Sequence, residues 1–219
     1  VPMAAVIIPE TEVTCTLLKE EVQRYAQHHG IQTCSFFSCD NLSRGLMKDA
    51  LQARVRKVLD ANPWMAGTLI KGDTFRYSTT VSDEWMKTVF EISENAATFS
   101  RKTPYQDINN ECISLAGLAP VKELIKSGRP ITKILAVSTS DNEMALIVSM
   151  AHAVVDGFTY YKILSMIGGA PIEAMIFERP SQTAYSQMET DMSGDAILKY
   201  GAGLSFVKHI VWNNVLKSK

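Results

Sequence analysis

Hydrophobic and polar residues follow two different periods along this chain, which predicts a protein that mixes helices with strands. The clearest helical period runs from Ser43 to Asp60, where an apolar stripe opposes a basic face. The stripe consists of Leu46, Met47, Ala50, Leu51, Val55, Val58 and Leu59, and the basic face of Lys48, Arg54, Arg56 and Lys57. We expect this helix to bury the stripe and to leave the basic face in solvent.

Three further helices are predicted from spacing and from residues suited to helix ends. The first runs from Leu17 to His29 and is stopped by Gly30. Another begins at Ser82, whose hydroxyl can cap it, and runs to Ile92. A short one follows Pro120, which suits a first turn, and ends by Lys126.

Runs rich in β-branched and aromatic residues predict strands, and turn-forming residues between some of them predict hairpins. The predicted strands are Thr33 to Phe37, Thr68 to Ile70, Thr74 to Thr80, Ile131 to Thr139 and Met144 to Met150. Residues 93–119 are polar and then mixed, and we predict mainly loop there, with a short strand at Ile113 to Leu115. The predicted fold class is therefore α+β, a layered mixed sheet with packed helices.

The most informative segment follows the last predicted strand. Met144 to Met150 is almost entirely apolar, which predicts a strand buried on both faces. After it comes His152-x-x-x-Asp156-Gly157, and then a helical stripe from Phe158 to Ile167 that Gly168-Gly169 ends as a left-handed cap would. His152 therefore lies on a strand-to-helix turn, where a rigid scaffold can present a side chain to a cleft.

Composition argues against several classes of protein but does not indicate a particular reaction. The 219 residues are 46% hydrophobic, enough to bury one core, and a net charge of −1 gives no basic excess to favour nucleic acid. No apolar run reaches the length of a membrane span, and no secretory signal is recognisable at Val1-Pro2. We therefore expect an intracellular or organellar protein that is not secreted.

The four cysteines indicate neither a metal site nor a disulfide framework. Cys15, Cys34, Cys39 and Cys112 show no Cys-x-x-Cys or His-Cys spacing. We expect reduced thiols in the core, no bound metal and no tightly bound cofactor.

A strand, the His152-x-x-x-Asp156-Gly157 motif and an amphipathic helix, in that order, resemble the active-site signature of the CoA-dependent acyltransferase superfamily. Its members include chloramphenicol acetyltransferase, condensation domains, wax ester synthases and BAHD acyltransferases. A weaker similarity lies at Asn62-Pro63-Trp64-Met65-Ala66-Gly67-Thr68-Leu69, which resembles the BAHD segment Pro-Leu-Ala-Gly-Arg-Leu, with Thr68 in place of its Arg. The resemblance implies a chloramphenicol acetyltransferase-like lobe at residues 1–180.

The resemblance also implies roles for the motif residues. His152 would be the general base that takes a proton from a hydroxyl or amine as that atom attacks an acyl-CoA or carrier-bound thioester. Asp156 would hold the loop by pairing with an arginine, for which Arg44, Arg54 and Arg129 are all candidates. Gly157 would let the backbone approach the acyl-donor arm or a neighbouring strand closely.

Partners are implied because two-lobed members of the superfamily complete the donor tunnel with a second lobe. The motif's position fits the first lobe, so we expect a missing second lobe, a homo-oligomer or a hetero-complex. The alternative is a non-catalytic structural subunit of a larger complex that keeps the fold, and a small-molecule binding module is a third hypothesis.

The remaining residues, 181–219, are predicted to form a polar linker and a C-terminal amphipathic helix. Ile197 to Lys219 carries apolar residues at helical spacing. Packing on its own lobe is the first expectation for this helix, and docking on a partner or peripheral contact with a membrane are the alternatives.

Overall fold

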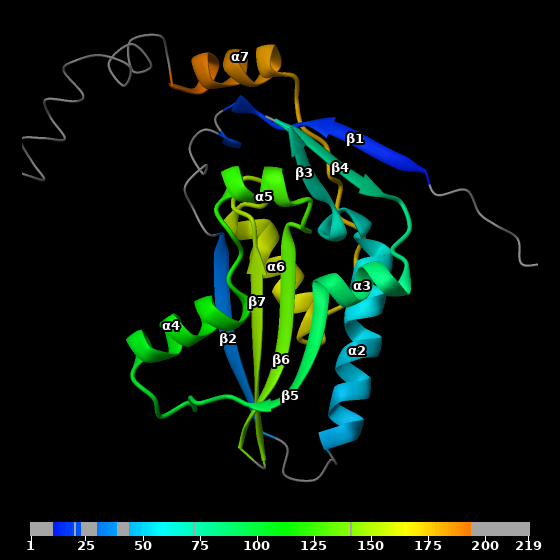
Figure 1. Ribbon diagram of the computed structural model, residues 1–219. Helices are drawn as coiled ribbons and strands as arrows, with labels where there is room; N and C mark the ends of the chain where they lie inside the picture. Colours follow the sequence, from blue (N-terminus) through cyan, green and yellow to red (C-terminus); the bar gives the residue numbers. More distant parts are fainter. Residues whose placement is uncertain are drawn as a thin grey trace, which may run out of the picture. The chain divides into compact units, whose positions relative to one another are not determined.

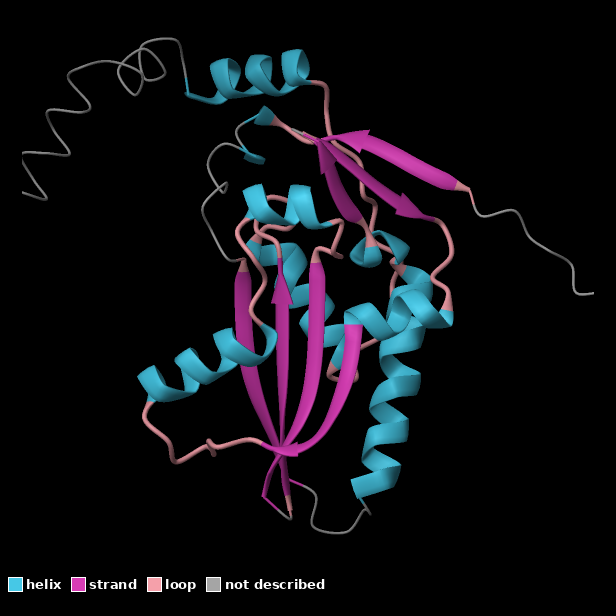
Figure 2. Ribbon diagram, viewed as in Figure 1, coloured by secondary structure: helices cyan, strands magenta, loops and turns pink. Residues whose placement is uncertain are grey.

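The structure is a computed structural model that describes residues 11–19, 21–22, 30–38, 44–71, 73–140 and 142–193. The chain divides into two compact units, Val1–Glu178 and Arg179–Lys219. The helices and strands of the first unit form a layered α+β lobe, as the sequence predicts (Figures 1 and 2).

A four-stranded mixed sheet forms the centre of the first unit. Its strands are β2 (Ile31–Ser38), β5 (Phe90–Ala96), β6 (Thr132–Ser140) and β7 (Glu143–Met150), in the order β2-β7-β6-β5. β7 pairs antiparallel with β2 and with β6, whereas β5 runs parallel to β6. β7 is thus an interior strand, and the predicted hairpin between the last two strands is confirmed.

Both faces of β7 are buried, as its continuous apolar run predicts. Leu146 and Val148 point into the main core, whereas Ala145 and Ile147 belong to a second apolar cluster on the opposite face. Because successive side chains of a strand alternate between faces, only a strand covered on both sides needs an unbroken apolar sequence.

Helices α2 (Arg44–Ala61) and α6 (Gly157–Ile167) share the main core with that first face. Val55, Val58 and Leu59 of α2 are fully buried, which confirms the second half of the predicted stripe, but Leu46 is 57% exposed and Ala50 is exposed, so its first half is wrong at these two positions. In α6 the fully buried Tyr160 donates its hydroxyl hydrogen to the Val148 carbonyl at 2.8 Å, and burial raises the pKa of this phenol to about 12. The helix is therefore tied to the strand that precedes it.

The basic face of α2 is not simply solvated, which corrects the prediction. Arg54 donates from Nε to the Met166 carbonyl at 2.7 Å and from Nη2 to the Ala170 carbonyl. Arg56 donates to the Val81 carbonyl at 2.5 Å and pairs with Asp60 and Asp83. These arginines bind backbone carbonyl oxygens of other segments, a role that helical periodicity does not reveal.

The predictions for residues 90–119 were partly wrong. The Ser82 hydroxyl caps α3 (Asp83–Val89) as expected, but this helix ends before β5, which pairs with β6 instead of continuing the helix to Ile92. The predicted loop contains helix α4 (Tyr105–Ala116), which packs through Cys112 and Ala116 on the second face of the sheet. Tertiary pairing and packing override the weak local signal in both places.

A smaller antiparallel sheet joins β1 (Glu12–Thr16), β4 (Thr74–Ser78) and β3 (Thr68–Lys71) in that order. The predicted hairpin of β3 and β4 is therefore confirmed. Two short helices complete this part of the lobe, the 3-10 helix η1 (Pro63–Ala66) and α5 (Val121–Ser127), whose first turn follows Pro120 as predicted.

Asn62 connects the end of α2 to the extended segment after α6. Its fully buried side chain donates to the carbonyls of Val58 at 3.2 Å and Glu173 at 3.0 Å, and accepts from the Met175 amide at 2.8 Å. Two residues further, the Phe177 ring stacks on Trp64 with centroids 5.1 Å apart. A buried polar residue with several hydrogen bonds thus fixes the course of this segment.

The second unit contains helix α7 (Gln182–Ser193), which lies within the stretch predicted as a polar linker. Side-chain hydrogen bonds four residues apart, such as that from Gln187 to Asp191 at 2.8 Å, support it. The predicted helix at Ile197 to Lys219 lies outside the described residues, as does most of Leu17 to His29. Among the helices that the structure describes, none has the length and apolarity needed to cross a membrane.

We predict that Asn62→Ala lowers the free energy of unfolding by about 1 to 3 kcal/mol, because it removes a buried side chain that binds the Glu173 carbonyl and the Met175 amide. Urea denaturation would measure the loss. Asn110→Ala, at an exposed position of α4, is the matched control and should change stability by less than about 0.5 kcal/mol. Equal effects of the two substitutions would contradict the role given to Asn62.

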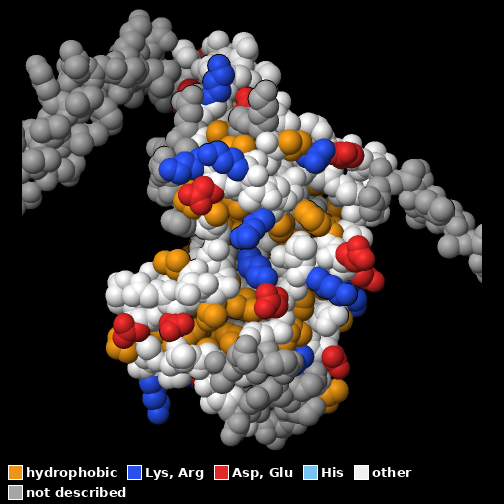
Figure 3. Space-filling view, viewed as in Figure 1, with side chains coloured by type: hydrophobic (Ala, Val, Ile, Leu, Met, Phe, Trp, Pro, Cys, Tyr) orange, Lys and Arg blue, Asp and Glu red, His pale blue; other side chains and the backbone are white. Residues whose placement is uncertain are grey.

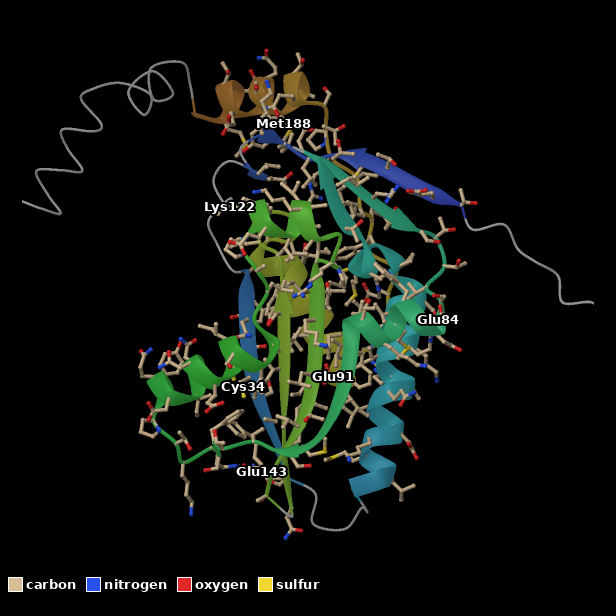
Figure 4. All side chains as sticks on the ribbon, viewed as in Figure 1. Cys34, Glu84, Glu91, Lys122, Glu143 and Met188 are labelled. Carbon is tan, nitrogen blue, oxygen red and sulfur yellow. The ribbon has the colours of Figure 1, made fainter. Side chains whose placement is uncertain are left out.

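A second prediction concerns Glu143 at the turn between β6 and β7, labelled in Figure 4. Desolvation raises the pKa of this carboxyl group, but hydrogen bonds from Thr139, at 2.9 Å, and from Arg101 outweigh it, so the pKa lies below its ordinary value. The lowered pKa means that the folded state favours the carboxylate, which stabilises the protein above the unfolded-state pKa of about 4.3.

We therefore expect the wild type to be more stable than Glu143→Gln at neutral pH. The difference should disappear as the pH falls through the folded-state pKa, where both side chains are uncharged. Denaturation of both proteins from pH 7 down to pH 3 would test this, and a difference that is the same at every pH would contradict it. Glu91→Gln, at an exposed ion pair with Lys133, is the control with the smaller expected effect.

Candidate active site

His152 lies directly after the central strand, in the turn that leads into α6. The Ala151 amide donates to the Ile131 carbonyl at 2.8 Å, which extends the pairing of β6 and β7 to the residue before His152. The amides of Val154 and Val155 then donate back to the Ala151 carbonyl at 3.0 and 3.2 Å. Ala153, Val154 and Val155 are buried, so the backbone of the turn is fixed on both sides of a half-buried His152.

The His152 imidazole is oriented by its own turn. Its Nδ1 lies 3.0 Å from the Val155 carbonyl oxygen. A carbonyl oxygen can only accept, so Nδ1 must carry the hydrogen and Nε2 of the neutral ring must carry the lone pair. This tautomer presents Nε2 as a proton acceptor, which is what a general base requires.

Asp156 caps the helix that follows the turn. Its carboxylate accepts from the Thr159 amide at 2.8 Å, and it is the N-cap residue of α6. A carboxylate at this position also interacts favourably with the helix dipole. The structure thus gives Asp156 a supporting role in the geometry of the turn.

The three arginines proposed as partners of Asp156 lie in different surroundings. Arg54 binds the carbonyls at the C-terminal end of α6, Arg129 is exposed after α5, and the side chain of Arg44 lies outside the described residues. The arginine pair of Asp156 therefore remains a prediction.

Two glycines lie close to the site, Gly30 and Gly157. A Cβ built on Gly157 would meet no atom of the described residues within 4 Å, so an approach to a neighbouring strand is wrong, while an approach to the acyl-donor arm stays a prediction. Gly30 has φ +96°, and a Cβ there would lie 2.4 Å from the Met150 carbonyl oxygen. The start of β2 therefore approaches the end of β7 at a distance that only glycine allows.

The second segment of similarity, Asn62 to Leu69, lies beside the first. The Ile131 amide donates to the Gly67 carbonyl at 2.9 Å, Thr68 forms an isolated bridge with Pro130, and the Ile131 carbonyl binds the Ala151 amide. Sequence resemblance suggested these two segments separately, and the structure joins them through Ile131.

The aromatic residues near the motif divide between the core and the surface. Tyr160 is fully buried, as expected for a core residue, whereas Tyr161 is 61% exposed and Phe158 is 75% exposed. Phe36 packs against the second apolar cluster, and Phe37 is 41% exposed. Tyr160 and Phe36 therefore pack in the interior, whereas Tyr161 and Phe37 face the surface.

Three hollows lie elsewhere on the lobe, and His152 lines none of them. The largest, about 450 Å³, follows the outer face of the small sheet and includes Thr68, Arg76 and Trp85. An apolar hollow of about 120 Å³ lies near Met144, at the opposite end of β7 from His152, and one of about 410 Å³ lies beside α3. In the part of the chain that the structure describes, no three His, Cys, Asp or Glu side chains are arranged to hold a metal.

No protein-family model matches the chain, and no curated protein matches it in sequence. Its fold, however, is similar to that of solved structures. Fusarium graminearum TRI101 in complex with ethyl coenzyme A has a TM-score of 0.50 and 9% identity, over 72% of this chain and 38% of that one.

Two further solved structures are similar at lower TM-scores. The condensation domain of the enacyloxin polyketide synthase, at 0.46, is 15% identical over 89% of this chain and 37% of its own. TRI3 trichothecene 15-O-acetyltransferase from Fusarium sporotrichioides, at 0.48, is 12% identical over 78% and 38%. The chain therefore spans well under half the length of these proteins, and its fold is similar to that of a part of TRI101.

Proposed function

We propose that this chain provides the catalytic-base lobe of an enzyme that transfers an acyl group from an acyl-CoA, or a carrier-bound thioester, to a hydroxyl or amine. The observation that carries the proposal is the hydrogen bond between His152 Nδ1 and the Val155 carbonyl, which assigns the lone pair to Nε2. The acyltransferase fold supports it, because it is known for TRI101 with coenzyme A bound.

In the proposed reaction, His152 Nε2 accepts the proton of the acceptor as its oxygen or nitrogen attacks the thioester carbonyl. Collapse of the tetrahedral intermediate breaks the C–S bond, and the imidazolium returns the proton to the departing thiolate. No covalent acyl-enzyme is needed, and the proton is transferred through a single nitrogen. Asp156 and Val155 support the geometry of the turn and do not contact the reacting atoms in this mechanism.

The proposal includes a second wall for the site, supplied by another lobe, by a second copy or by a partner subunit. His152 is half-buried on the lobe and lines none of the three hollows described above. Acyl transfer in water competes with hydrolysis, and a site closed on one side only would not exclude water.

The alternative function is that of a non-catalytic subunit that keeps the acyltransferase fold. The hydrogen bond between His152 Nδ1 and the Val155 carbonyl is compatible with it too, because such a bond can persist for structural reasons alone. Under this hypothesis the Nδ1 bond of His152 serves only to close the turn before α6.

We predict that the source protein, in its native assembly, releases CoA from at least one member of a mixed acyl-CoA panel when hydroxyl and amine acceptors are present. His152→Ala should lower this rate by about 10² to 10⁴-fold, because it removes the base without changing the fold. Released thiol reports the rate, and native mass spectrometry of the same sample gives the assembly.

The matched control is Lys122→Ala, at an exposed position of α5, which should leave the rate unchanged. Loss of activity in both variants would indicate a general defect. An assembly that is inert toward every acyl-CoA would support the subunit hypothesis. Binding of acyl-CoA that survives His152→Ala, without any turnover in the wild type, would instead indicate a binding module.

A further inference from the structure

Two cysteines that are far apart in sequence meet on the second face of the large sheet. Cys34 belongs to β2 and Cys112 to α4, and Cys34 packs against the apolar cluster that contains Cys112. The other cluster residues around them are Ile147 and Ala145 of β7 and Phe36 of β2, among others. Hydrophobic side chains gather on this face of the molecule beside α4 (Figure 3).

Strand register and one glutamine place the two thiols on the same side of the sheet. Cys34 pairs with Ile147, whose side chain belongs to the same cluster. The Gln32 side chain donates from Nε2 to the Cys112 carbonyl at 3.1 Å and to Ser149 Oγ at 2.7 Å. Because residues 32 and 34 share one face of β2, this bond holds the backbone of Cys112 over the strand that carries Cys34.

The two thiols also interact directly. A hydrogen bond to Cys112, together with burial, raises the pKa of Cys34, and the same hydrogen bond lowers the pKa of Cys112. Cys112 is 2% exposed, whereas Cys34 is half-buried and labelled beside α4 in Figure 4.

We propose that Cys34 and Cys112 form a reversible disulfide that links helix α4 to strand β2 when the protein meets a mild oxidant such as hydrogen peroxide. The cysteines are both free in the structure, which therefore represents the reduced form. This inference rests on the thiol pair alone and does not depend on the proposed acyl transfer.

The chemistry balances with peroxide as the oxidant. One of the two cysteines, as its thiolate, attacks one peroxide oxygen, the O–O bond breaks, and hydroxide leaves and takes up a proton to become water. The other cysteine then gives up its proton and attacks the resulting sulfenic acid. The S–S bond forms as the S–O bond breaks, and a second water leaves. Two thiols are oxidised and one peroxide is reduced.

The bond would close a long loop of the chain and join two elements that otherwise meet through apolar packing and the Gln32 side chain. Closing a loop of this length restricts the unfolded chain, so we expect the midpoint of thermal unfolding to rise by about 10 °C on oxidation. Dithiothreitol should reverse the rise. A merely oxidised thiol, such as a sulfinic acid, would not be reversed in this way.

The experiment uses the full chain, reduced and then treated with stoichiometric hydrogen peroxide under native conditions. Trypsin digestion without reductant should give a cross-linked product of peptide 25–44 and peptide 103–122, which contain Cys34 and Cys112. Peptide 25–44 also contains Cys39, so the same digest of Cys39→Ser should still give the product.

Matched variants decide the assignment. Cys34→Ser should lose both the cross-link and the thermal shift, whereas Cys15→Ser should keep both. Cys112→Ala should also lose both. If Cys112→Ala does not fold, the result for Cys34→Ser decides the test. The proposal is overturned if the native wild type keeps both thiols, is oxidised without the cross-link, or forms it only in urea.

Discussion

Two backbone hydrogen bonds through Ile131 are the connection on which the lobe depends most. Its amide binds the Gly67 carbonyl and its carbonyl binds the Ala151 amide, at 2.9 and 2.8 Å. The first bond lies at the start of the small sheet and the second at the end of the central strand. Buried backbone groups must be paired, so the Gly67 segment and Ala151 cannot separate without breaking at least one of these bonds. The position of His152, one residue further, follows from this connection and not from its own side chain.

Some helices and strands could be predicted because their own residues show the hydrophobic pattern of that element. The continuous apolar run of β7 and the second half of the apolar stripe of α2 are buried as their patterns predict. α4 could not be predicted, because its buried residues Cys112 and Ala116 are small and only four positions apart, and its other faces are exposed. β5 depends on its parallel pairing with β6, a partner 44 residues away in sequence at the first paired position, Phe90 with Ile134. The residues of β5 alone do not show that this segment pairs with β6.

The candidate site shows the same division. The strand-to-helix turn could be predicted, because a buried run, a short polar motif and a helical stripe follow one another. Its supports could not be predicted in this way. Gly30 resembles a helix stop in sequence, yet its glycine is needed to approach Met150. Arg54 resembles a solvated helix residue, yet it binds carbonyls at the end of α6. The roles of Gly30 and Arg54 both depend on contacts with backbone groups. Every residue has these groups, so a pattern of side chains in the sequence does not predict such contacts.

The hydrogen bond that orients His152 would persist if the imidazole accepted a proton. Nδ1 donates to the Val155 carbonyl in the neutral ring, and it would still donate in the protonated ring, since both nitrogens of imidazolium carry hydrogen. Taking a proton at Nε2 would therefore leave the turn's own hydrogen bond intact. Asp156 adds a negative charge in the same turn, where it is already held by the Thr159 amide. A base supported in this manner changes its charge without a change in its position, which limits the reorganisation that proton transfer requires.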